Sequence, residues 1–275
     1  MQPIKHMGIS KKLLIQRFEK NTKNTNKILS KYITNPTDDN IHDMRVAMRR
    51  LNVVSTILPK KIRKNSSFSQ YLEQSWKLFK DNTEIRDCDI LLEKLGDYQH
   101  EPLDQIISLI EKKRKSGLEK CHNDAMKLKK LKLSTLQNNK VSKSKIQEKF
   151  SKLVQKRYYK INKLFPIVLQ SYKNVEELHL LRKEIKKLRY LFELLPNSKI
   201  KKLVNELKNL QTILGDIHDS DMMISFLREI KTNDVSIILH NEEERRSENY
   251  EKFVTLVKTQ HIYPPRLQMD KSIID

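Results

Sequence analysis

The sequence predicts an all-α protein made of two related antiparallel helical bundles, arranged about a pseudo-two-fold axis with a basic central groove. The chain has 275 residues but only 4 glycines, too few for the many tight turns of a sheet-rich fold. Charged residues (32%) are interleaved with hydrophobic ones (37%), which is typical of amphipathic helices. One segment also occurs twice, as Ile41 to Leu58 and as Leu178 to Leu195, and a proline follows each copy at once.

The first half, residues 1–136, is expected to consist of helices joined by short breaks. Pro36 and Pro59 mark two helix ends, because proline disfavours helical backbone in the residue before it. A short helix is expected to follow Arg86-Asp87 and to end at Gly96, since glycine is favoured just past helix ends. The helices expected here lie at about residues 8–33, 38–58, 68–82, 88–95 and 102–133.

The second half, residues 137–261, repeats this order after a polar, aperiodic stretch at 134–144, which we interpret as the link between the halves. The two halves are expected to form one domain, followed by an irregular tail at 262–275. The expected helices lie at about residues 145–169, 175–195, 198–214, a shorter stretch after Asp219, and 234–257.

The charge balance indicates a polyanionic partner. The chain carries 55 Lys and Arg against 34 Asp and Glu, a net charge of +21, and such a surplus raises the local concentration of polyanions. Nucleic acid, an anionic membrane or another phosphate polymer are therefore candidate partners, although part of the lysine content can reflect genomic base composition. Cys88 and Cys121 lie far apart with no CxxC pattern, and neither a secretory leader nor a membrane-spanning apolar run is seen. We expect a cytoplasmic protein without cofactors, disulfides or membrane association.

Each copy of the repeated segment has an apolar seam at helical spacing, which is expected to be buried against neighbouring helices. The seam residues are Ile41, Met44, Met48, Leu51 and Leu58 in the first copy, and Leu178, Leu181, Ile185, Leu188, Phe192 and Leu195 in the second.

A row of cations runs beside each seam. On a helix, offsets of 0, 3, 7 and 10 residues stay within about 80° of arc and climb about 15 Å. A run of charges on one helix is usually only a solvated face or a set of structural ion pairs, but matching runs beside matching seams favour a binding role. The row contains His42, Arg45 and Arg49 in the first copy, and His179, Arg182, Lys186 and Arg189 in the second. Arg50, Lys187 and Lys183 continue round the outer side of the helices. We call the first row together with Arg50 the first rail, and the second row together with Lys187 the second rail.

Such rails suit a linear polyanion whose charges recur along its length. Arginine offers paired donors to phosphate oxygens, lysine offers a flexible point charge, and histidine offers a donor whose charge depends on pH near neutrality. If the halves pack about a pseudo-two-fold axis, the two rails face one another across a groove, and a phosphate chain lies between them.

A second repeated element follows each rail, as Arg86-Asp87-Cys88-Asp89 and as His218-Asp219-Ser220-Asp221. The side chains could form a metal or acid–base site. The interpretation we favour is that Asp87 and Asp219 cap the following helices, or that the acids orient a phosphate-binding arginine. Arginine in one copy and histidine in the other do not suit a shared metal site.

These two elements resemble the pattern of the CHAD family, the conserved histidine α-helical domain: His-x-x-Arg-x-x-x-(Arg/Lys)-(Arg/Lys)-Leu-Arg, then Arg-Asp-x-Asp or His-Asp-x-Asp, all repeated. The resemblance covers nearly the whole chain. It implies an all-helical fold of two related bundles that binds inorganic polyphosphate in a basic central channel without catalysis. It also implies that the residues of both rails bind polyphosphate, with further candidates at Lys77, Lys80, Arg86, Lys183 and Lys208.

The chain departs from the family pattern at Asn52, which stands where the pattern places an arginine matching Arg189. Contacts at that end of the first rail are expected to be weaker, or to come from neighbouring helices. The Glu-x-Glu-x-Lys motif of the triphosphatases to which some CHAD domains are attached does not occur, so the chain is interpreted as a stand-alone binding module.

The function expected first is therefore non-enzymatic polyphosphate binding. One alternative is a general nucleic-acid binder, although the rails are poor in aromatics for base stacking, and Trp76, Tyr158 and Tyr159 are expected to serve the core. Weak non-specific nucleic-acid binding is expected in either case. A less favoured alternative is a metal-dependent phosphohydrolase using His218, Asp219 and Asp221. The basic surface proposed for nucleic acid consists of Lys112, Lys113, Arg114, Lys129, Lys130 and Lys132.

Overall fold

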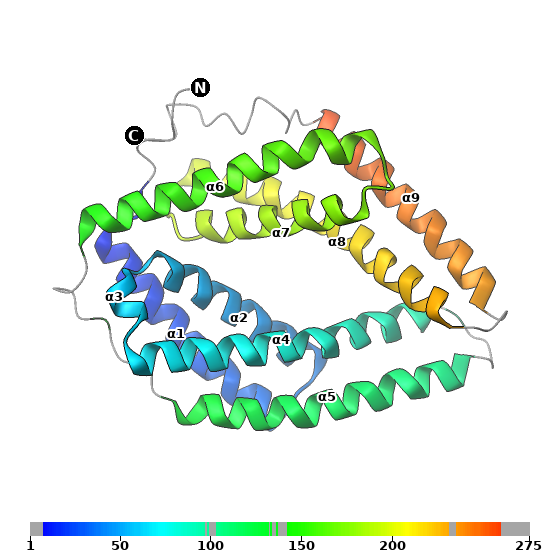
Figure 1. Cartoon of the computed structure of the whole chain (residues 1–275), viewed down its shortest axis with the longest axis horizontal. Coiled ribbons are helices and arrows are strands. Elements are labelled where there is room, and N and C mark those ends of the chain that lie inside the picture. The colour runs from blue at the N-terminus through cyan, green and yellow to red at the C-terminus, as the bar shows by residue number, and fades with distance from the viewer. Residues whose placement is uncertain are drawn as a thin grey trace. The chain divides into compact units, whose positions relative to one another are not determined.

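The computed structural model describes residues 8–96, 98, 103–131, 133, 136, 142–230 and 235–259. Every regular element within these ranges is a helix, so the all-α prediction is confirmed (Figure 1). The chain divides into two compact units. The N-terminal unit is Ser10–Ile146, and the C-terminal unit is Gln147–Asp275 together with Met1–Ile9. None of the described helices is both long and apolar enough to span a membrane.

The N-terminal unit begins with two long helices whose ends follow from local chemistry. Ser10 and Thr37 act as N-caps, because their hydroxyl oxygens accept the N–H groups of Leu13 and Asn40. Asn65 caps a later helix in the same way. The helices are α1 (Lys11–Thr34), α2 (Asp38–Ile57), the short α3 (Lys60–Arg63), α4 (Ser66–Leu95) and α5 (Asp104–Lys130).

The core of this unit lies where α1 packs on α2, α2 on α4 and α4 on α5 (Figure 1). Phe18 and Phe68 stack with ring centroids 5.6 Å apart, and each buried ring of this kind contributes about 1.5–3 kcal/mol. The buried Tyr32 hydroxyl donates to Oδ1 of Asn82 at 2.9 Å, which satisfies both polar groups inside the core.

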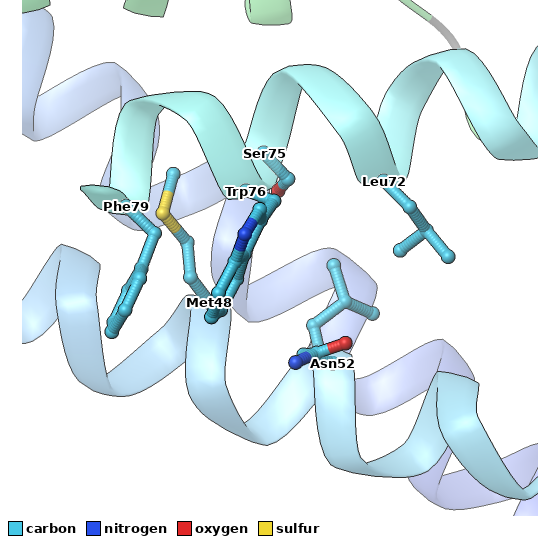
Figure 2. Close-up of a pocket in the computed structure, with 7 residues that line it drawn as sticks. Met48, Asn52, Leu72, Ser75, Trp76 and Phe79 are labelled. Carbon is cyan, nitrogen blue, oxygen red and sulfur yellow. The ribbon is translucent and has the colours of Figure 1, made fainter. Parts of the chain in front are cut away.

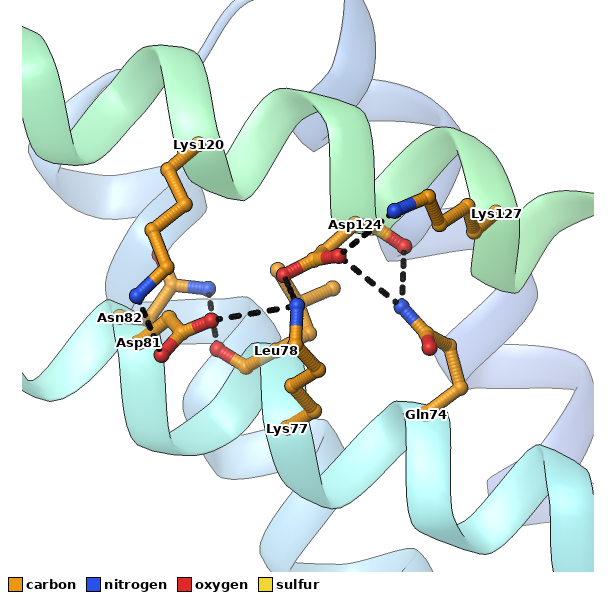
Figure 3. A network of polar contacts seen from close by, with 8 residues as sticks. All are labelled: Gln74, Lys77, Leu78, Asp81, Asn82, Lys120, Asp124 and Lys127. Carbon is orange, nitrogen blue, oxygen red and sulfur yellow. Dashed lines mark hydrogen bonds and ion pairs between the residues drawn. The ribbon is translucent and has the colours of Figure 1, made fainter.

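Ion pairs add a polar seam between α4 and α5 (Figure 3). Asp124 of α5 is nearly fully buried and accepts from Lys77, while Gln74 donates to its backbone oxygen at 3.0 Å. Lys120 reaches Asp81 at 3.1 Å. These contacts fix how α5 lies along α4 and leave the α2 side of α4 to other residues.

The C-terminal unit has its long helices in the same order: α6 (Lys143–Gln170), α7 (Val175–Phe192), α8 (Ser198–Glu229) and α9 (Ser236–Thr259). Helix α8 packs on both α7 and α9. Phe165 and Phe253 stack at 6.4 Å, and the Tyr250 hydroxyl donates to the Val168 carbonyl at 2.8 Å.

The predicted helix breaks around residues 83–87 and 215–218 are wrong, because α4 and α8 run through them without interruption. Asn82 stays helical by donating to the Leu78 carbonyl four residues earlier. Gly215 lies inside α8, where an added Cβ would meet a nitrogen of Arg182 at an ordinary contact distance of 3.7 Å. Asp87 and Asp219 therefore cannot cap helices, since both lie in helix interiors.

The other boundaries differ by a few residues. Helix α7 ends at Phe192 rather than near 195, and α6 begins at Lys143, inside the stretch expected to link the halves. The rest of that stretch, apart from residues 136 and 142, and the tail at 262–275 lie outside the described residues.

Candidate functional site

Both apolar seams are buried as predicted. All five seam residues of α2 and its end have at most 3% exposure, as do those of α7 from Leu178 to Phe192. Leu195, which lies after the helix, is only partly buried. The buried seams fix the rotation of α2 and α7, and hence the direction in which their cations point.

The first rail contains two kinds of cation. His42 and Arg50 are exposed and Arg49 is half-buried, but Arg45 is only 8% exposed. Arg45 donates to the Thr83 hydroxyl at 3.0 Å and to the Phe79 carbonyl at 3.4 Å, so it ties α2 to α4. The accessible charge of this rail therefore comes from its other three members.

Arg86 of α4 lies close enough to His42 to affect its titration. Partial burial, together with the positive charges of Arg86 and Arg49, lowers the pKa of His42 from its usual value. Arg86 is in turn 4.0 Å from Asp89 and 3.9 Å from Glu93. The structure thus brings Arg86 close to the first rail, and its binding of polyphosphate stays a prediction.

The second rail is more heavily engaged by carboxylates. Arg189 is 9% exposed, donates to the Gln211 amide oxygen at 2.8 Å and pairs with Glu193. Lys187 is exposed and pairs with Glu184 at 2.8 Å. Arg182, Lys186 and His179 are half-buried, and Lys183 is exposed beside them.

His179 belongs to a buried polar cluster between α7, α8 and α9. Its Nε2 lies 3.0 Å from Oδ2 of Asp221 and 3.0 Å from Nδ1 of His218. Because the carboxylate can only accept, His179 Nε2 donates its single hydrogen to Asp221. Burial, reinforced by the charges of Arg182 and His179, lowers the pKa of His218 to about 3, so this ring is neutral at physiological pH.

Asp221 is held by an arginine from the last helix. Arg246 of α9 donates from Nε to Oδ1 of Asp221 and also reaches the Tyr172 carbonyl at 2.9 Å. Although burial acts in the opposite direction, the bonds from His179 and Arg246 keep the pKa of Asp221 below its usual value. Asp221 therefore fixes one ring nitrogen of His179 and leaves the other for a partner.

The N-terminal unit contains the matching arrangement. Arg114 of α5 donates from Nε to Oδ1 of Asp89 at 2.6 Å and also pairs with Asp38. In both units the arginine follows the aspartate by 25 residues. Asp89 and Asp221 each pair with an arginine, and that these acids orient a phosphate-binding arginine stays a prediction. Arg246 was missed, and the shared spacing is the signal that could have identified it.

A metal site is not supported. Within the described ranges, no group of three or more His, Cys, Asp or Glu side chains is placed to hold an ion. His218 and Asp221 are instead engaged with His179 and Arg246.

The remaining candidates are distributed over α4 and α8. Lys80 and Lys208 are exposed, whereas the ammonium group of Lys77 pairs with Asp124 of α5 (Figure 3). Two of the aromatic residues expected in the core are instead on the surface, since Trp76 is 54% exposed and Tyr159 56%. Both residues lie in helices, as their spacing predicts, but the spacing does not show which face of each helix is covered by its neighbours.

Comparisons with known proteins agree with this arrangement. The chain is similar in fold to the crystal structure of the CHAD domain from the plant Ricinus communis, with a TM-score of 0.53, 14% identity, and coverage of 99% of this chain and 94% of that one. A search of curated proteins gave no match. The CHAD domain profile matches residues 16–228, most of the chain and both repeated elements. The chain therefore belongs to the CHAD family.

Proposed function

We propose that this protein binds inorganic polyphosphate through its two rails and does not chemically alter it. Some members of the CHAD family bind polyphosphate, and this chain has the family's basic pattern in both units. Both cysteines are buried free thiols, which suits action in a reducing cytoplasm.

The observation that carries the proposal is that each unit has both a buried aspartate–arginine pair and a row of more accessible cations. A buried aspartate is anchored by an arginine from the last helix, and exposed or half-buried cations lie along the rail helix beside it. Burying an ion pair stabilises little in itself but fixes geometry. Cations held on a rigid helix lose less side-chain entropy on binding phosphate than cations on a flexible tail.

The rails suit a repeating anion better than a single phosphate. Two accessible cations, Arg49 and Arg50, follow the exposed His42 along α2, and α7 presents several more cations. A chain of phosphates can contact each in turn, and every contact releases bound counterions, so affinity falls as salt is added. The arrangement of the two rails across a common groove stays a prediction.

A calorimetric titration tests the proposal. Long-chain polyphosphate is compared with single- and double-stranded DNA at equal phosphate concentration and about 0.15 M salt, a concentration that screens general attraction. We expect saturable polyphosphate binding with DNA much weaker, and no release of phosphate. Equal affinities that fall together with added salt contradict the proposal.

Variants then locate the site. Arg45 is unsuitable, because it is buried and bonded inside its unit. Arg49→Gln with Lys186→Gln removes one matched cation from each rail, and Lys129→Gln with Lys130→Gln removes two exposed cations of α5 as the control. At roughly 1.5 kcal/mol per charged contact, the rail variant weakens polyphosphate binding about 100-fold. A similar loss in the control places binding elsewhere.

A further inference from the structure

Two stacked aromatic rings, the exposed Trp76 and the half-buried Phe79, lie on the same side of α4 as the first rail. Trp76 is 54% exposed and stacks on Phe79, with ring centroids 5.0 Å apart and planes inclined by 13°. Figure 2 shows both rings extending from α4 toward α2, with the indole seen nearly edge-on between Phe79 and Leu72. Phe79 covers one face of the indole, so the other face is directed toward Leu72 and Asn52.

A small hollow lies between α2 and α4 at this point. Its cavity volume is about 20 Å³, room for roughly one water molecule. A flat ring therefore cannot enter the hollow, but it can lie over the open side against the exposed part of Trp76. The hollow is lined by Met48, Leu51, Asn52, Leu72, Ser75, Trp76 and Phe79.

The hollow contains an unsatisfied polar group. Ser75 is only 6% exposed, and its hydroxyl oxygen has no hydrogen-bond partner among the described residues. A buried hydroxyl of this kind usually has one. The exposed Asn52 adds an amide that can both donate and accept. The hollow thus offers one aromatic face and two hydrogen-bonding groups.

Positive charge lies on the other side of the ring pair. The guanidinium carbons of Arg45 and Arg49 are 4.9 and 5.2 Å from the Phe79 ring centroid, within cation–π range. Arginine, phenylalanine and tryptophan therefore follow one another in a stack. A ligand on the outer face of Trp76 is separated from these arginines by the two rings, so its phosphates must extend back along α2 to reach Arg49.

The second repeat lacks this feature. When the repeated elements are aligned, Trp76, Phe79 and Asn52 correspond to Lys208, Gln211 and Arg189. Arg189 donates to Gln211 there, which makes the equivalent surface polar and cationic. The aromatic site is thus an addition to the first rail, at the position where that rail lacks an arginine.

We propose that the outer face of Trp76, at the open side of this hollow, binds a nucleobase carried on a phosphate chain. The base stacks on the outer face of Trp76, its edge bonds with Asn52 and Ser75, and its phosphates reach Arg49. Each base stacked on an aromatic side chain typically adds affinity without requiring one base identity. This proposal goes beyond the proposed function, because polyphosphate contains no bases. The base site and the polyphosphate site share only the arginines of the first rail.

Trp76 provides its own assay, because it is the chain's only tryptophan. The full chain is titrated with ATP, with a short single-stranded oligonucleotide, and with inorganic tripolyphosphate as the base-free probe. We expect ATP or the oligonucleotide to quench Trp76 fluorescence and tripolyphosphate to leave it nearly unchanged. Quenching by ATP identifies a free nucleotide as the ligand, and quenching by the oligonucleotide alone identifies a nucleic-acid strand. Absence of quenching by both, or equal quenching by tripolyphosphate, overturns the proposal.

Variants separate base binding from phosphate binding. Trp76→Lys introduces the residue found in the second repeat, and the control Tyr159→Lys changes an equally exposed aromatic residue of α6. Calorimetry is expected to show roughly 5- to 150-fold weaker binding of the base-containing ligand to the Trp76 variant, with tripolyphosphate binding retained and the control unchanged. Ser75→Ala keeps the reporter and weakens only the base-containing ligand.

These results also distinguish the two proposals. Loss of polyphosphate binding with base-dependent quenching intact leaves this inference standing and refutes the proposed function. Polyphosphate binding without base-dependent quenching supports the proposed function and refutes this inference.

Discussion

Replacing Asp221 by asparagine tests the buried pair that supports the second rail. The carboxylate accepts from Arg246 through Oδ1 and from His179 through Oδ2, and the side chains of Asp221 and Arg246 are 8% and 9% exposed. Asparagine keeps the size of the side chain but removes its charge. Arg246 is then a buried cation without its carboxylate partner.

The expected cost follows from this burial. Breaking a buried ion pair by removing one partner typically costs 3–5 kcal/mol. Arg246 keeps its bond to the Tyr172 carbonyl, so we take the lower end, about 3 kcal/mol. At roughly 2–4 °C per kcal/mol, the melting temperature of the C-terminal unit falls by about 6–12 °C. Because the pKa of Asp221 lies below its usual value, this stabilisation is present above about pH 4 and is lost as pH falls through the folded-state pKa.

Asp89→Asn is the matched control in the other unit. Arg114 retains Asp38 as a partner after the change. Burial also raises the pKa of Asp89 despite the nearby Arg114, so its ionised form contributes less stability. We expect a loss of about 1 kcal/mol, within the range of ordinary substitutions.

The assay follows unfolding by circular dichroism and by Trp76 fluorescence. Circular dichroism reports helices of both units, whereas the single tryptophan lies in α4 and reports only the N-terminal unit. Asp221→Asn should therefore introduce an early transition in circular dichroism and leave the fluorescence transition in place. Equal shifts for the two variants, or an early fluorescence transition in Asp221→Asn, contradict the assigned roles of the two aspartates.

Three further predictions concern protonation and helix packing. Because the pKa of His42 is lowered, polyphosphate affinity should continue to rise as pH falls below about 6.5, and titrations of His42→Gln should lose that part of the dependence. The pKa of His218 is about 3 in the folded state, so between about pH 6.5 and 3 the folded protein binds fewer protons at this ring than the unfolded chain does. Its contribution to the free energy of unfolding therefore falls as pH drops, by about 2 kcal/mol at pH 5. The slope of urea-unfolding free energy against pH should be shallower in His218→Asn, and an unchanged slope speaks against a neutral buried ring. Gly215→Ala should stabilise the protein by about 0.5–1 kcal/mol, because its Cβ would meet Arg182 at an ordinary contact distance of 3.7 Å. At Gly117 a Cβ would be only 3.1 Å from Ile85. Thermal unfolding should therefore show a gain in stability for Gly215→Ala and none for Gly117→Ala.

The sequence predicts the helices and seams well because both follow from local spacing. Apolar residues three and four apart share one helix face whatever lies opposite, so the burial of Met44 and Leu181 could be inferred without knowing their neighbours. Proline after each repeated segment likewise acts on the adjacent backbone alone.

The predicted breaks in α4 and α8 are wrong because aspartate has two common roles. It can cap the N-terminus of a helix, or it can accept a hydrogen bond from a side chain distant in the sequence, and only the tertiary structure decides between these roles. Asp89 and Asp221 each accept a hydrogen bond from an arginine 25 residues further along the chain. The helices therefore continue through the motif. Trp76 illustrates the same limit, since the side of α4 that α5 covers depends on the ion pairs of Asp124.

The two units use a shared pattern to make different surfaces. In the first, Arg45 is buried against Phe79 and Asn52 replaces the last cation, so aromatic rings occupy that end of the rail. In the second, Arg189 is buried against Gln211 and Glu193 at the corresponding end, and the surface there stays polar. Each rail thus uses one arginine of the pattern for its own structure, and a different one in each unit. The family pattern alone therefore overstates how alike the two surfaces are, and substitutions at matched positions should be compared by burial rather than by alignment.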